Sequence, residues 1–126
     1  MGKFTRLICL LLIVSAVSCK KKTTDDENKD LTVCGVKDPI KNLSWLNAKF
    51  KSLEGGANMN GIVLYRLNGS EVIEIQGSIF SSTNQHQYYC DGTKLNLDEP
   101  SAFNEFKKER KLIGVLYGTN IWKDWK

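Results

Sequence analysis

The tripeptide Asn68-Gly69-Ser70, between two runs of strand-forming residues, constrains the fold of this chain more than any other sequence feature. Asn and Gly readily adopt the positive φ angles that a two-residue hairpin turn requires, and such a turn joins neighbouring antiparallel strands. The flanking runs, residues 61–67 and 71–77, are rich in Val, Ile and Leu. The sequence therefore predicts a β-hairpin over residues 61–77.

The two faces of the second hairpin strand differ in polarity. Successive side chains of a strand point to opposite faces, so Ile73 and Ile75 share one face. Val72, Glu74 and Gln76 share the other. Because an antiparallel strand with one solvated side alternates in this way, we expect the face that carries Glu74 to be exposed to water.

Two amphipathic helices are predicted outside the hairpin. Asp38-Pro39 supplies a helix-capping residue followed by a proline at the first helical position, and apolar residues then recur every three to four positions up to Leu53. Residues 100–111 give the second helix, in which two phenylalanines lie three positions apart. Its last turn is basic, which suits the negative end of the helix dipole.

Two further strands complete the expected fold. Residues 87–90 predict a third strand, with residues 94–97 as a candidate partner across a turn, and residues 112–117 predict a final strand. Consecutive hairpins favour antiparallel pairing. We therefore predict an α+β fold: a small antiparallel or mixed sheet of about four strands, with the two helices packed on one face.

The first eighteen residues have the pattern of an export signal. Lys3 and Arg6 precede an apolar run, residues 7–14, and small residues follow it. The run is much shorter than the roughly 20 residues of a membrane-spanning helix, so we expect residues 1–18 to be a removable signal peptide.

The end of this signal, Ala16-Val17-Ser18-Cys19, resembles the lipobox of bacterial lipoproteins. The resemblance implies cleavage before Cys19, a diacylglyceryl thioether on its sulfur, and a further acyl chain such as palmitate on its amino group. Two or three acyl chains anchor a protein stably, whereas one binds only marginally. We therefore expect a protein held in the cell envelope by lipid on Cys19, on its periplasmic or cell-surface side. The alternative is an ordinary secretory signal with Cys19 as a free thiol.

The residues after the lipobox are strongly polar. Residues 20–30 contain eight charged residues and no apolar one. Such a segment cannot bury enough apolar surface to fold alone. We therefore predict a flexible tether over residues 19–32, followed by a single domain over residues 33–126.

Two cysteines, Cys34 and Cys90, remain in the predicted domain. Disulfides form in oxidising compartments, so an exported chain with two remaining cysteines is expected to join them. The alternative makes Cys34 a thiolate nucleophile with His86 as its base.

Two short segments resemble small lipoproteins of the Bacteroidota type. They are Cys34-Gly35-Val36-Lys37-Asp38-Pro39, at the predicted start of the first helix, and Tyr88-Tyr89-Cys90-Asp91-Gly92. The resemblance supports the envelope location and the disulfide, and implies no activity.

Charge and residue inventory exclude several function classes. Without Lys3 and Arg6 the mature chain has 16 basic and 14 acidic residues, too small an excess for nucleic-acid binding by a basic surface. His86 is the only histidine, so we expect no His/Cys metal site and no cofactor. Glu71 and Glu74 lie three apart on one strand, on opposite faces, and do not form an acid/base pair.

Aromatic residues are the remaining candidates for a function. The candidate binding surface comprises His86, Tyr88, Tyr89, Trp122 and Trp125. We expect a non-enzymatic, lipid-anchored module that binds a protein or a glycan. The alternatives are a small envelope hydrolase or thiol enzyme that uses Cys34 and His86, and an inhibitor of a foreign hydrolase such as lysozyme, with residues 81–86 as the inserted loop.

Overall fold

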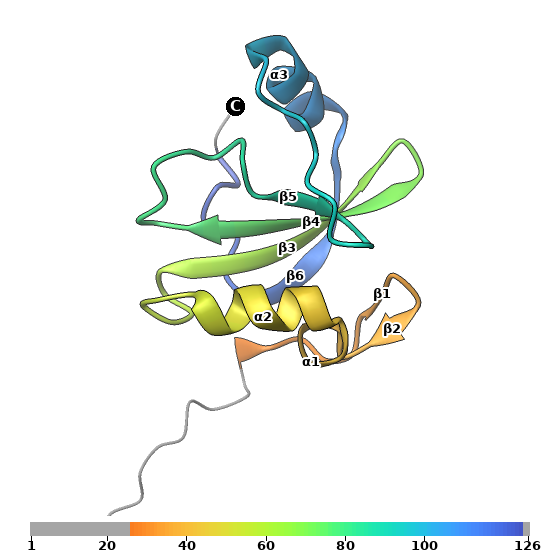
Figure 1. The fold of residues 1–126 in the computed structure, drawn as a ribbon, viewed down its shortest axis with the longest axis vertical. Coiled ribbons are helices and arrows are strands. Elements are labelled where there is room, and N and C mark those ends of the chain that lie inside the picture. The colour runs from red at the N-terminus through yellow and green to blue at the C-terminus, as the bar shows by residue number, and fades with distance from the viewer. Residues whose placement is uncertain (1–25, 125–126) are drawn as a thin grey trace, which may run out of the picture.

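The structure, a computed structural model, describes residues 26–124 (Figure 1). Its elements, in chain order, are β1 (Thr32–Val33), β2 (Val36–Lys37), α1 (Pro39–Asn42), α2 (Ser44–Ser52), β3 (Asn60–Leu67), β4 (Ser70–Gly77), β5 (Gln87–Tyr89), α3 (Pro100–Glu109) and β6 (Lys111–Gly118). Four strands form an antiparallel sheet in the order β5-β4-β3-β6. The remaining two, β1 and β2, pair in a second, small sheet. The predicted α+β fold class is confirmed. The signal peptide, Cys19 and Trp125 lie outside the described residues.

The predicted hairpin is present as β3 and β4. The two strands pair in register from Asn60 opposite Gly77 to Leu67 opposite Ser70. Asn68 and Gly69 in the turn have φ angles of 48° and 84°, the left-handed values that their identity predicted. The third strand, β5, extends the sheet beyond β4. Its candidate partner segment contributes one isolated bridge, between Lys94 and Tyr88.

The first predicted helix is interrupted at Leu43, which has extended backbone angles and divides it into α1 and α2. Side chains six positions apart on a continuous helix point about 120° away from each other. The interruption allows Ile40 of α1 and Leu46 of α2 to be buried in the same core. Pro39 occupies the first helical position as predicted, whereas Asp38 has a φ of 48° and its side chain makes no capping hydrogen bond.

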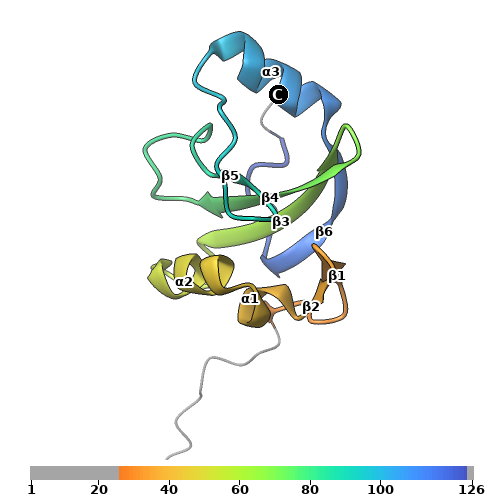
Figure 2. The same ribbon diagram turned by 45° about the vertical axis from the view of Figure 1, so that its right-hand side comes forward.

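The helices lie on opposite faces of the four-stranded sheet, so the prediction that both pack on one face is wrong (Figures 1 and 2). Leu46 of α2 belongs to the core cluster that contains Ile73 of β4. Phe106 of α3 clusters with Val72, whose side chain points to the other face. The ring of Phe106 lies 6.2 Å from the ring of Tyr65. Each face of the sheet therefore has its own apolar core.

The polar face of β4 is buried, in contrast to the predicted exposure to water. Glu74 and Gln76 are 1% and 0% exposed, and Val72 beside them is fully buried. Alternation along a strand separates two faces but does not reveal whether the more polar one meets solvent or a second layer. Here α3 and the segment after β6 form that second layer.

The end of the predicted tether belongs to the folded unit. Glu27 forms a β-bridge with Tyr117, and the backbone N–H of Asn28 donates to the carbonyl of Leu116. Backbone pairing with an edge strand requires no apolar side chains, which is why the polar composition gave no indication of it. Within residues 26–124, no helix has the length and apolar character needed to cross a membrane.

Candidate functional site

A buried carboxylate organises the face of the sheet that α3 covers. Glu74 accepts hydrogen bonds from Nε2 of Gln76 at 2.7 Å and from Nε2 of Gln87 at 2.8 Å. Its Oε2 also forms a salt bridge of 3.1 Å with Nη1 of Arg110, the C-cap residue that follows α3. The carboxylate is therefore fully compensated, as a buried charge must be.

The same network reaches the segment that follows β6. Gln76 accepts the backbone N–H of Ile121 through its Oε1 at 2.8 Å, and its Nε2 donates to Oδ1 of Asn120 at 2.8 Å. Nδ2 of Asn120 donates to the hydroxyl of Tyr65 at 3.4 Å. A chain of hydrogen bonds thus connects buried Glu74 with the Tyr65 hydroxyl.

Arg110 is held on three sides. Its guanidinium lies 4.5 Å from the ring centre of Tyr65 and 5.3 Å from that of Phe106, in cation–π geometry, while Nη1 faces Glu74. The side chain is 10% exposed. Because stacking and ion pairing fix the plane of the guanidinium, its outer edge is a preorganised donor group.

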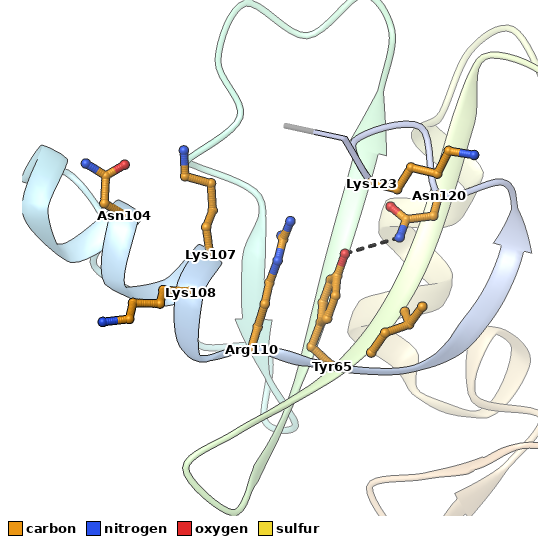
Figure 3. A pocket seen from close by; sticks show the side chains of 8 residues that line it. Tyr65, Asn104, Lys107, Lys108, Arg110, Asn120 and Lys123 are labelled. Atoms are coloured by element: carbon orange, nitrogen blue, oxygen red, sulfur yellow. Dashed lines mark hydrogen bonds between the residues drawn. The ribbon is translucent and has the colours of Figure 1, made fainter. Parts of the chain in front are cut away.

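Above Arg110 the surface is hollowed into a cleft of about 570 Å³, which we call the basic cleft. Its lining residues are Tyr65, Asn104, Lys107, Lys108, Arg110, Leu112, Asn120 and Lys123. Figure 3 shows Lys107, Arg110 and Tyr65 extending in the same direction, with Lys123 beyond Asn120 on the other side. The lining comes from α3, β3, β6 and the segment after β6, so only the folded chain assembles it.

The chemistry of the basic cleft favours an anion. Four of its lining residues are cationic and none is acidic. Because Glu74 balances the charge of Arg110 from below, the net positive charge of the lining comes from its three lysines. Burial raises the pKa of Tyr65 above its usual value, and the nearby Glu74 carboxylate adds to this, so the phenol keeps its proton at neutral pH. Ammonium, guanidinium, amide and phenol groups are donors that suit a carboxylate or a phosphate.

The four described members of the predicted aromatic binding surface, His86, Tyr88, Tyr89 and Trp122, do not share one exposed patch. Tyr88 is buried against Trp45, at 5.5 Å between ring centres, whereas Tyr89 points to the opposite face and is 41% exposed. Trp122 is only 4% exposed. Trp125 lies beyond the described residues. Neighbouring strand residues alternate between faces, and large aromatic side chains fill the core where they can.

His86 belongs to an aromatic stack rather than to an open site. Its ring lies 4.2 Å from that of Phe80 and 6.1 Å from that of Trp122. Burial lowers the pKa of His86 below its ordinary value, so the imidazole is neutral at neutral pH. In the described structure its ring packs in this stack and is hydrogen-bonded to the backbone of Ser82, and its backbone carbonyl accepts the N–H of Ile75.

The predicted disulfide is present between Cys34 and Cys90. It joins the turn between β1 and β2 to the residue that follows β5. The thiol that the Cys34/His86 hypothesis needs is therefore oxidised in this structure. The loop of the alternative inhibitor hypothesis, residues 81–86, is bonded to the rest of the domain, because Nδ2 of Asn84 donates to the carbonyl of Leu97 and Gln87 donates to that of Thr83.

The basic cleft is not predicted from the sequence, although one signal of it, the basic last turn of α3, is visible there. A basic last turn also complements the helix dipole, so by itself it does not indicate a binding site. Tyr65, Arg110 and Lys123 are distant in sequence, and only the packing of α3 on the sheet brings them together.

No protein-family model matches the chain, and neither a curated protein nor a solved structure is significantly similar to it. The function proposed for the chain therefore rests on its own residues and their geometry.

Proposed function

We propose that this chain is a non-enzymatic binding module, lipid-anchored in the bacterial cell envelope, whose basic cleft binds a carboxylate- or phosphate-bearing glycan. The observation that carries the proposal is that Lys107, Lys123 and the stacked Arg110 all line one cleft of about 570 Å³. That volume falls in the range of roughly 300 to 1,000 Å³ typical of small-ligand sites. Protein partners bury flatter and larger surfaces, so an anionic sugar is the better fit.

The position of the cleft supports a ligand from the envelope rather than the anchoring membrane. The described chain begins at the end of the molecule opposite α3, whose residues line the cleft (Figure 1). Cys19 precedes Asp26 by seven residues, which span at most about 25 Å. An acylated Cys19 therefore holds the membrane near the end of β6 where Tyr117 pairs with Glu27, whereas the cleft lies at the α3 end of the molecule.

The lipid anchor gives a first prediction. Intact mass spectrometry of the protein extracted from membranes is expected to show a chain that begins at Cys19 and carries fatty acyl groups. Cys19→Ser should lose both the acyl mass and the membrane association, because the thioether needs the sulfur. A native product that is soluble in water and carries no acyl group would refute the anchor.

The cleft gives a second prediction, tested by calorimetric titration. Oligogalacturonate, a carboxylated glycan, and inorganic phosphate are the anionic probes, and an uncharged malto-oligosaccharide is the neutral one. Charged hydrogen bonds contribute about 1.5–3 kcal/mol each, so Lys107→Gln/Lys123→Gln should weaken oligogalacturonate binding by at least about tenfold. Rising salt should weaken it further.

The matched control for this experiment removes the same charge elsewhere. Lys41→Gln/Lys51→Gln alters two exposed lysines on α1 and α2, across the sheet from the cleft. Binding should be unchanged in this control. Equal weakening in both double variants would indicate non-specific charge attraction, and equal binding of the neutral sugar would contradict an anion site. Phosphate binding without oligogalacturonate binding would refute the proposed glycan ligand and indicate a site for a small anion.

A further inference from the structure

Three possible metal ligands meet at a place that the proposed function does not use. One ligand atom each from Cys34, Glu71 and Cys90 lie within 4.8 Å of one another, and all three residues are half-buried. Oε2 of Glu71 accepts the backbone N–H of Cys34 and lies 3.7 Å from Sγ of Cys90. They come from three separate parts of the chain: the β1–β2 turn, the start of β4 and the residue after β5.

The spacing of these atoms agrees with a tetrahedral zinc site. With Zn–S near 2.3 Å and Zn–O near 2.1 Å, neighbouring ligand atoms lie roughly 3.6–3.8 Å apart. The distance of 3.7 Å between the Glu71 oxygen and the Cys90 sulfur already has this value. The two sulfurs, bonded to each other in the oxidised protein, would have to separate to about 3.8 Å.

We propose that, once its disulfide is reduced, the protein binds Zn²⁺ through Sγ of Cys34, Sγ of Cys90 and the Glu71 carboxylate, with water as the fourth ligand. A dithiol reductant supplies two electrons and two protons, becomes a disulfide itself, and leaves two thiols on the protein. Zn²⁺ then displaces the two thiol protons, because thiolates are the metal-binding form. The metal closes the same loop that the disulfide closed, so the cross-link survives reduction.

The identity of residue 71 distinguishes this proposal from a purely structural role. Cys34 has a φ of 55° in the β1–β2 turn, and its backbone N–H needs an acceptor. An amide oxygen would satisfy that donor as well as a carboxylate, but would be a much weaker zinc ligand. Glu71→Gln therefore preserves the turn contact and removes the ligand charge.

The test uses the full chain in detergent, with Cys9→Ser and Cys19→Ser to remove the other two thiols. The protein is reduced with a phosphine and titrated with Co²⁺ under anaerobic conditions. We expect a thiolate-to-cobalt charge-transfer band that saturates at one Co²⁺ per chain and disappears when Zn²⁺ is added. The oxidised protein should show no such band.

Glu71→Gln should bind Co²⁺ at least about tenfold more weakly, since loss of even an outer partner of a metal site costs roughly 10- to 100-fold in affinity. Glu105→Gln, an exposed residue of α3, should bind like the parent chain. Circular dichroism follows the fold in parallel. A reduced chain that unfolds and is restored by Co²⁺ supports the proposal. Absence of the band in the reduced chain, folded or unfolded, overturns it, and so does unchanged affinity in Glu71→Gln.

Discussion

Replacing Arg110 by methionine is expected to lower the free energy of unfolding by about 3–5 kcal/mol, because it leaves a buried carboxylate without its cation. Glu74 is 1% exposed and lies 3.1 Å from Nη1 of Arg110. Methionine keeps an apolar side chain of similar length against Tyr65 and Phe106, so the loss reports the missing charge more than a cavity. Urea denaturation at neutral pH measures the difference.

A second variant separates the ion pair from the rest of the network. Glu74→Gln/Arg110→Met has no buried charge, and replacing both members of a buried pair is often nearly neutral. We expect the double variant to be more stable than Arg110→Met alone, while Gln87 still finds a side-chain acceptor at position 74. A loss below about 1 kcal/mol in Arg110→Met would mean that water reaches and solvates the carboxylate, as at a surface pair.

Features set by local chemistry were predictable from the sequence. The Asn68-Gly69 turn needs only its own residues to adopt positive φ angles, and it fixed the β3–β4 hairpin. The Cys34–Cys90 bond followed from counting thiols in a chain expected to be exported. Both inferences depend on few residues and on rules that hold regardless of the remaining fold.

Features set by packing between distant segments were not predictable in this way. Nothing in the alternation around Glu74 reveals that α3 covers that face, because a strand pattern is the same whether its polar side meets water or a buried arginine. The basic cleft depends on the same packing, which brings Lys107 and Lys123, from opposite sides, into the lining of one cleft. The aromatic residues could not be assigned for a related reason. The large apolar area of Trp122 suits a core residue as well as a binding residue, and only the packing shows that it is buried.

Removing the disulfide by Cys34→Ser/Cys90→Ser is expected to lower the free energy of unfolding by roughly 4 kcal/mol. The bond joins residues with a sequence separation of 56, and the chain-entropy estimate for such a loop gives that value. Typical domains are stable by only about 5–15 kcal/mol, so the variant should unfold at much lower urea concentrations. The oxidised parent chain and the double-serine variant are compared by urea denaturation.

The same pair of variants tests how the bond stabilises the protein. Because a disulfide acts mainly by restricting the unfolded chain, the folded double-serine variant should keep the near-ultraviolet circular dichroism of the parent, including the contribution of Trp45, whose Nε1 donates to the carbonyl of Cys90. Its larger unfolded state should also expose more surface and give a steeper dependence of stability on urea. A stability loss with a changed native spectrum would instead place the effect in the folded state, where the β1–β2 turn would have detached from the end of β5.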